Sequence, residues 1–164
     1  MVIQKTFKFR LYPNPQPRLF LARQFGCARY VYNHFLAERM AFYAAHQGEK
    51  KQGLTYGDTA KRLTELKRQS GTEWLQAVNA QVLQQSLLNL EAAYKNFFAG
   101  RAGFPKFKRK HDQQSIRVPQ HFTLDADTGH LCLPKMTPLK IVLHRPVAGQ
   151  LKSVTVTHRP SGRY

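Results

Sequence analysis

Residues 103–110, Gly-Phe-Pro-Lys-Phe-Lys-Arg-Lys, interleave two aromatic side chains with four cations. The glycine and the proline of this run are incompatible with a regular helix, so a loop is expected. Cations bind phosphate groups, and an aromatic face can stack on a base or a ribose. The alternative is a solvated charge run in which Phe104 and Phe107 anchor the loop to the core. The candidate contacts to a nucleic acid are Lys106, Phe107, Lys108, Arg109 and Lys110.

Three glutamines lie close together at positions 81, 84 and 85. Gln81 and Gln84 are three residues apart, which places them on one face of a helix. A glutamine amide can form paired hydrogen bonds with N6 and N7 of adenine, so an exposed pair can read base edges in a major groove. Ordinary helix-surface glutamines are the alternative.

The whole chain is strongly basic, with 26 Lys and Arg against 9 Asp and Glu in 164 residues and a formal net charge of +17. This excess favours a polyanionic partner, and a nucleic acid is favoured over an anionic membrane surface. A hydrophobic fraction of 42% with 11 Phe, 7 Tyr and 1 Trp excludes a disordered basic tail. Each further cation alone is a solubilising surface charge. Together they can line a channel for a nucleic-acid backbone: Lys5, Lys8, Arg10, Arg18, Arg23, Arg29, Arg117, Lys140, Arg145 and Lys152.

Acidic residues are few and scattered. Metal-dependent phosphodiester cleavage needs several carboxylates around Mg²⁺ ions about 4 Å apart. Asp125 and Asp127 lie in an expected turn and most other acids on expected helices, so we find no nuclease, hydrolase or nucleotide-binding signature. Cys27 and Cys132 stand alone, which argues against a zinc site and a disulfide framework. The sequence has no apolar run of membrane-spanning length and no signal-peptide pattern, so we expect a soluble, intracellular protein.

The positions of apolar residues predict three helices. Asn14 followed by Pro15 suits the start of a long amphipathic helix that reaches about Ala45. A second helix is expected from Asp58, as its cap, to about Gln69. A short element at residues 74–75 then leads to a third long helix that begins near Asn79.

Strands are expected at both ends of the chain. Residues 3–10 alternate apolar and polar side chains, which is typical of a half-buried strand. Further strands are expected at 115–118, 122–124, 130–133, 139–143 and 153–157, with a hairpin turn at 125–129. Their number and spacing predict a small barrel or sandwich that the N-terminal strand joins. The expected fold class is α+β, a β domain interrupted by a helical insertion.

Ordered motifs along the chain resemble the transposon-encoded OrfB/TnpB family. Lys5-x-Phe7-x-Phe9-Arg10-Leu11-Tyr12-Pro13 opens the series and Gly26-x-Ala28-Arg29-x-Val31-Tyr32-Asn33 follows. The later motifs are Leu54-Thr55-Tyr56-Gly57, Trp74-Leu75, Leu83-Gln84-x-Ser86-Leu87-x-Asn89-Leu90, Ala93-Tyr94-x-Asn96-Phe97-Phe98 and Gly103-Phe104-Pro105-x-Phe107. The resemblance therefore covers essentially the whole sequence.

The resemblance implies an RNA-guided DNA endonuclease of insertion-sequence elements. It implies a barrel-like β wedge domain, residues 1–12 and 103–164, interrupted by a helical recognition lobe, residues 13–102, with a helix-turn-helix-like start. The implied partners are a guide RNA and double-stranded target DNA with a short transposon-adjacent motif, without a membrane, in the prokaryotic cytoplasm at the nucleoid. Tyr12 belongs to the opening motif, and Tyr56 with Gln81 and Gln84 would face the DNA motif.

In the family, a RuvC-like nuclease domain with an acidic triad and a zinc-binding cysteine insert follows the wedge strands. We therefore expect residues 1–164 to be the non-catalytic N-terminal part of such a protein, by gene decay or by choice of fragment. No cofactor is expected for this chain, and Mg²⁺ is implied for the missing nuclease domain. Two alternatives stay open: a stand-alone DNA-binding repressor, and a nuclease active only with a separate RuvC-like chain.

Overall fold

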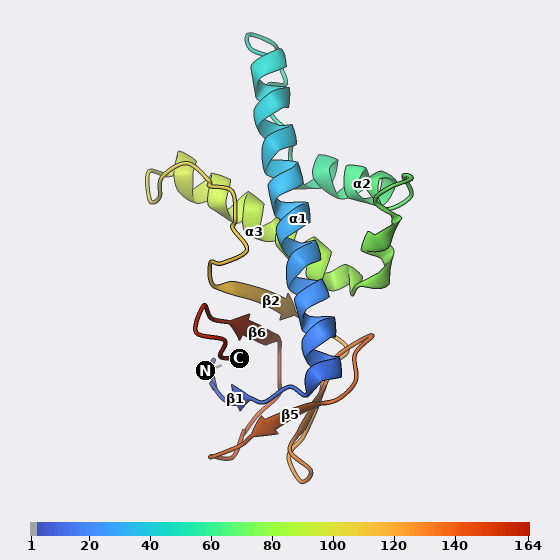
Figure 1. Ribbon diagram of the computed structural model, residues 1–164. Coiled ribbons are helices and arrows are strands. Elements are labelled where there is room, and N and C mark those ends of the chain that lie inside the picture. The colour runs from blue at the N-terminus through green and yellow to red at the C-terminus, as the bar shows by residue number, and fades with distance from the viewer. Residues whose placement is uncertain (1–2) are drawn as a thin grey trace.

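A long helix, α1 (Pro15–Ala45), runs through the computed structural model, which describes residues 3–164 (Figure 1). Asn14 is its N-cap residue, and prolines at the first helical positions cost no hydrogen bond because those N–H groups have no partner within a helix. The Asn14 side chain makes no capping hydrogen bond. The helix ends where the His46 N–H donates to the Phe42 carbonyl at 3.1 Å. The predicted bounds of this helix are confirmed.

Three further helical elements follow: α2 (Tyr56–Leu66), the short 3₁₀ helix η1 (Glu73–Ala77) and α3 (Ala80–Phe98). The predictions of η1 and of a helix beginning after Asn79 are confirmed. The prediction for α2 is wrong at both ends: Thr55 and not Asp58 is the cap, and the helix ends at Leu66 and not near Gln69. Thr55 Oγ1 accepts from the Asp58 N–H at 3.3 Å, and Asp58 Oδ2 accepts from the Thr55 N–H at 2.9 Å. This reciprocal capping box places the N-cap three residues before Asp58, and the helix begins at Tyr56.

The strands form two antiparallel sheets. One has the order β1 (Arg10–Leu11), β5 (Leu139–Val142), β4 (His130–Cys132) and β3 (Thr123–Asp125). The other pairs β2 (Gln114–Val118) with β6 (Val154–His158), with Ile116 opposite Val156. All five predicted C-terminal strands and the turn at 125–129 are confirmed to within one residue at each end. Among residues 3–164 the sheets do not close into a barrel, so the α+β class is confirmed and the barrel prediction is not.

The strand expected over residues 3–10 is wrong for residues 3–9, since only Arg10–Leu11 form β1. Arg10 pairs with Val142, where β5 ends, so the preceding residues have no strand opposite them. Phe7 and Phe9 instead lie on one side of the chain, with ring centroids 6.4 Å apart. The alternation therefore predicted that these two rings lie on one side of the chain. It did not predict whether the backbone of residues 3–9 has a neighbouring strand to pair with.

Two clusters of buried side chains hold the fold together, and α1 contributes to both. Phe35 and Leu36 pack among the helices, whereas Leu21 and Phe25 pack against the sheets. Each such side chain contributes about 1.5–3 kcal/mol when it is fully buried. The predicted division into residues 1–12 with 103–164 and residues 13–102 stays a prediction.

Within the described residues, no helix is both long and apolar enough to cross a membrane.

Candidate nucleic-acid interface

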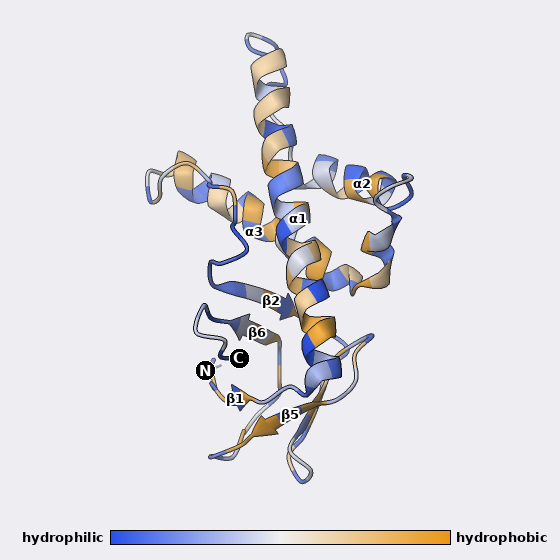
Figure 2. Ribbon diagram, in the orientation of Figure 1, coloured by the Kyte–Doolittle hydropathy of each residue, from blue (hydrophilic) through white to orange (hydrophobic). Residues whose placement is uncertain are grey.

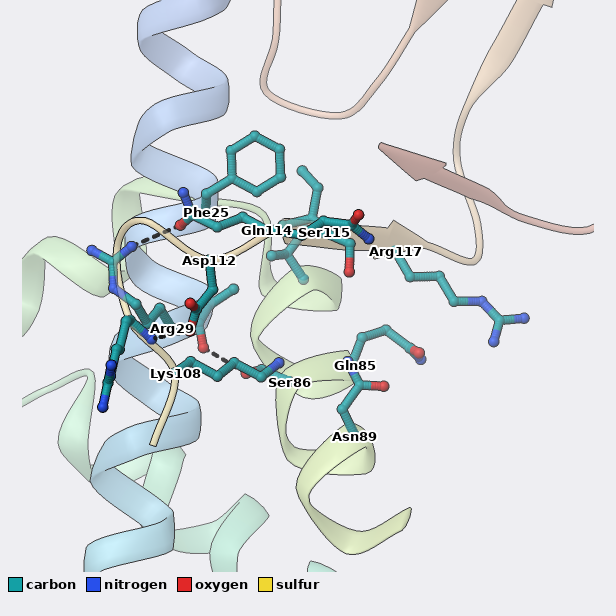
Figure 3. A pocket seen from close by; sticks show the side chains of 15 residues that line it. Phe25, Arg29, Gln85, Ser86, Asn89, Lys108, Asp112, Gln114, Ser115 and Arg117 are labelled. Atoms are coloured by element: carbon teal, nitrogen blue, oxygen red, sulfur yellow. Dashed lines mark hydrogen bonds between the residues drawn. The ribbon is translucent and has the colours of Figure 1, made fainter. Parts of the chain in front are cut away.

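A polar groove of about 230 Å³ lies where α1, α3 and the chain entering β2 meet (Figure 3). The chain that enters β2 is coloured hydrophilic in Figure 2. Phe25, Val82 and Ile116 supply apolar lining and belong to the core cluster below the sheets. The cationic and amide side chains that line the groove are Arg29, Lys108, Arg109, Arg117, Gln85, Asn89, Gln113 and Gln114.

Two small residues bring α1 and α3 together beside the groove. Ser86 Oγ donates to the Ala28 carbonyl at 2.6 Å, and Ser86 is buried. Short side chains at this crossing let the two helices approach closely, so larger residues on either side line the space left beside them. The crossing of α1 and α3 therefore forms one side of the groove, and the chain entering β2 forms the other.

Arg29 is held in place across the groove. Its Nη1 donates to Gln114 Oε1 at 2.7 Å, and Gln114 Nε2 donates to the Lys110 carbonyl at 3.2 Å. Arg29 thus links α1 to the first residue of β2 and to the basic loop. A guanidinium has five donors, and Gln114 is a neutral partner. The charge of Arg29 and most of its donors therefore remain available for an anion.

The basic loop is anchored to α1 through Asn33. Asn33 Nδ2 donates to the Lys108 carbonyl at 2.9 Å, and the Lys108 N–H donates to Asn33 Oδ1 at 2.8 Å. Lys108 Nζ lies 4.2 Å from the centroid of the Tyr32 ring. Desolvation at this position lowers the pKa of Lys108, although part of the residue is exposed to solvent. The loop therefore presents its cations in a defined place.

No carboxylate forms an ion pair with the groove cations among residues 3–164. The ion pairs of this part of the chain all lie between residues 34 and 91. Asp112 is the one acid in the groove lining, and its Oδ2 accepts the backbone N–H of Arg109 at 3.1 Å. That carboxylate helps to shape the loop, and four cations around it keep the groove electropositive.

The structure brings four of the predicted contacts into the groove, namely Arg29, Lys108, Arg109 and Arg117. Lys106, Phe107 and Lys110 are exposed on the same loop. Phe104 packs edge-on against Phe97, with centroids 5.3 Å apart, whereas Phe107 is half exposed. A second group of predicted contacts lies outside the groove, around β1 and the start of α1: Lys5, Lys8, Arg10, Tyr12 and Arg18.

The predicted base-reading residues take different positions. Gln81 Oε1 accepts the Gln120 N–H at 3.0 Å, so one of its two polar atoms holds the chain that follows β2. Gln84 is exposed, and Gln85 lines the groove. Tyr56 begins α2 and packs against the helical core cluster, outside the groove lining.

Arg145 also lies outside the groove. Its guanidinium carbon is 5.5 Å from the Phe7 ring centroid and 5.8 Å from that of Phe9. It therefore fixes the N-terminal segment to the chain after β5, while its charge has no carboxylate partner among residues 3–164.

Sequence analysis missed Asn89, Gln113 and Gln114 as groove residues. Gln113 and Gln114 lie a few residues after the basic run, beyond His111 and Asp112, and that nearness was the one signal available. Asn89 is one turn beyond Gln85 on α3, and only the crossing with α1 shows that this face lines a groove.

The resemblance implies Mg²⁺ for the nuclease domain and not for residues 1–164. Within residues 3–164, no three His, Cys, Asp or Glu side chains lie close enough together to hold a metal ion. We therefore derive no catalytic step through a metal for this chain.

Comparison with known proteins gives matches along the chain. Residues 1–48 match the family described as a helix-turn-helix domain, of the OrfB type from IS605-like elements. In the structure, this range contains β1 and α1, and α2 begins only at Tyr56.

Three relatives are similar to most of the chain. A candidate RNA-guided DNA endonuclease, InsQ of Escherichia coli K12, is 39% identical over 93% of this chain and 37% of its own length. A Streptomyces pristinaespiralis protein named in the same way is 34% identical over 99% of this chain and 40% of its own length. The virulence protein VsdF of Salmonella dublin is 32% identical over 65% of this chain and 94% of its own length. The chain thus spans about two fifths of the first two relatives, and it belongs to the transposon-encoded OrfB/TnpB family.

Proposed function

We propose that this chain is the nucleic-acid-binding N-terminal part of an RNA-guided DNA endonuclease and that it does not itself cut DNA. The observation that carries the proposal is the groove between α1, α3 and β2, where four cations have no carboxylate partner among the described residues. Cations arranged along a groove bind a phosphate backbone through charge and counterion release. The names of the two longer relatives support RNA and DNA as the polyanions.

The groove residues have separate roles in this proposal. Arg29 and Arg117 lie on different elements, α1 and β2, and would each contact a phosphate. Lys108 and Arg109 extend this line of charge onto the basic loop. Gln85 and Asn89 on α3 would donate or accept hydrogen bonds at sugar or base edges. Gln84, exposed on the same helix, is the proposed contact to a target-flanking DNA motif.

The Arg117→Ala variant tests the groove directly. Arg117 is exposed, and its one hydrogen bond to another side chain, to Ser153 Oγ, is long at 3.3 Å, so the fold should tolerate the change. We expect weaker binding to guide RNA and to duplex DNA, and a salt slope of binding that is shallower by about 1.

Lys61→Ala is the matched control, because it removes one exposed positive charge from α2, outside the groove lining. Equal losses for Arg117→Ala and Lys61→Ala would show that net charge alone governs binding, and the groove would lose its role.

A stand-alone DNA-binding repressor is the second candidate, and the match of residues 1–48 to a helix-turn-helix family favours it. The two functions differ in their need for RNA. Binding to DNA with the element's end sequence is measured with and without RNA transcribed from that end. Equal affinity in both measurements would favour the repressor, whereas dependence on the RNA would favour the guide-binding role.

A further inference from the structure

A second hollow, of about 870 Å³, lies between α1 and η1 and has a different lining from the groove. Aromatic rings dominate it, from Tyr30 and His34 of α1 and from Trp74 of η1. None of these three residues lines the groove. Among the residues that the structure describes, no Asp or Glu lines the hollow.

The rings in the hollow are held in fixed positions relative to one another. The Tyr30 ring meets Trp74 edge-on, with centroids 5.0 Å apart and planes at 67°, and stacks on His34 at 5.7 Å and 21°. Trp74 Nε1 donates to the Gly71 carbonyl at 2.8 Å, so its polar atom is satisfied within the protein. The indole nevertheless keeps 44% of its surface exposed. An indole that is held in place and keeps nearly half of its surface exposed is suited to stack on another ring.

Gly26 keeps one wall of the hollow open. It lies within α1, where a glycine costs roughly 0.5–1 kcal/mol relative to alanine. A Cβ atom placed there would have no heavy atom within 4 Å, so crowding within this chain does not require the glycine. The absence of a side chain leaves room beside the rings.

Positive charge borders the hollow. Arg23 and Arg29 both line it, and Arg29 also lines the groove. The two concavities therefore share Arg29, so a strand whose backbone follows the groove cations can continue along that side chain to the hollow.

We propose that this hollow binds one unpaired nucleotide of a single strand, with its base stacked on Trp74 and its phosphate against Arg23 and Arg29. The proposal rests on the proposed function, because the groove must first hold the strand. Every base has a flat π face, so the site would accept any base and would favour single strands over duplexes. Single-stranded RNA and DNA share this chemistry and are compared in the test.

Trp74 is the only tryptophan in the chain, so its fluorescence reports on this site alone. Titration of the full chain at low salt with a short single-stranded RNA, and with DNA of the same sequence, should quench the emission in a saturable manner. Heparin, a polyanion without bases, should bind the cations with much less quenching. Oligonucleotide binding that leaves the Trp74 emission unchanged would overturn the proposal. A hollow that is occupied by a protein segment and by no nucleotide would overturn it as well.

Variants test the site without relying on fluorescence. Trp74→Ala should weaken binding of a labelled single strand about tenfold, as expected for loss of one base stack, and Trp74→Phe should restore most of it. Gly26→Leu should fill the hollow and weaken single-strand binding more than duplex binding, with the helix intact because space is available. Tyr43→Ala, at a side chain that is 53% exposed near the end of α1, is the matched control and should bind as the wild type does.

The outcomes separate the two proposals. If the wild type binds and the Trp74 and Gly26 variants bind equally well, this site is wrong while the groove stands. If the wild type binds neither strand at low salt, the proposed function itself fails.

Discussion

The helical half and the β half of this molecule use their charges differently. In the helical half, four carboxylate contacts to cationic or histidine side chains join residues between 34 and 91. Residues 101–164 hold 12 Lys and Arg but only 3 Asp and Glu. There, Asp112 and Asp125 accept backbone N–H groups in turns. Carboxylates thus tie helices together in one half and shape loops in the other, which leaves the cations of the β half for an external anion.

Arg39 and Arg145 give the largest contrast in stability. Arg39 donates to the Leu54 carbonyl and to Glu91 Oε2, the latter at 2.8 Å, and lies over the Tyr94 ring; only 11% of its side chain is exposed. Removing one partner of such a network leaves the others unsatisfied, so we expect Arg39→Ala to cost about 2–3 kcal/mol. Urea unfolding measures this loss.

Arg145→Ala is the counterpart in the β half. Arg145 contacts two rings and is exposed, so the variant should lose less than about 1 kcal/mol. Equal losses for the two variants would break the comparison between the halves.

Two glycines, one in each half, give a second contrast in stability that is smaller than that between Arg39 and Arg145. Gly129, in the turn between β3 and β4, has φ +66°, and an added Cβ would lie 3.1 Å from the Ile141 carbonyl oxygen. We expect Gly129→Ala to destabilise the protein by about 1–2 kcal/mol. Gly26→Ala should instead stabilise it by about 0.5–1 kcal/mol, because α1 has open space there. Thermal unfolding of both variants checks the opposite signs.

The smallest expected effect on stability is the loss of the Asp58 contribution to α2 at low pH. Hydrogen bonds from the Thr55 backbone and from Lys51 and Thr55 side chains lower the pKa of Asp58. The stabilisation by the charged carboxylate is therefore present above the ordinary carboxyl range, near pH 4, and is lost as the pH falls below it.

The Asp58→Asn variant isolates this contribution. Its melting temperature should lie below that of the wild type at pH 6, and the difference should shrink towards pH 3. Asp127→Asn is the control, because the Asp127 carboxylate accepts no hydrogen bond from residues 3–164. A difference for Asp58→Asn that stays constant with pH would contradict the expected role of the charge.

Local sequence signals predicted the long elements well. Asn14-Pro15 and the apolar spacing that follows specify α1 through contacts within a few turns of one another, and the turn at 125–129 depends on its own residues. The start of α2 was misplaced although Thr55 and Asp58 have the spacing of a capping box. In a capping box the first residue is the N-cap and the acid is the third helical residue, so this pair carried a local signal for the start that the choice of Asp58 as the cap missed.

Features that depend on distant segments were less predictable. The groove needs α1, α3 and the loop before β2 to meet. Its cations were predicted as parts of a channel, but Asn89, Gln113 and Gln114 were not predicted. Trp74 forms an exposed ring surface only because η1 lies beside Tyr30. Neither arrangement has a signature in sequence spacing, because it joins residues far apart along the chain, such as Arg29 with Gln114 and Tyr30 with Trp74.

The salt dependence of binding tests the central claim most directly. If the four groove cations each contact a phosphate, the logarithm of the binding constant for duplex DNA should fall with the logarithm of salt concentration, with a slope of about −3.6 or steeper. Filter binding or anisotropy over a range of salt concentrations measures this slope. A steep slope, made shallower by Arg117→Ala and unchanged by Lys61→Ala, is the predicted result. A flat dependence, or no binding at low salt, would contradict the account.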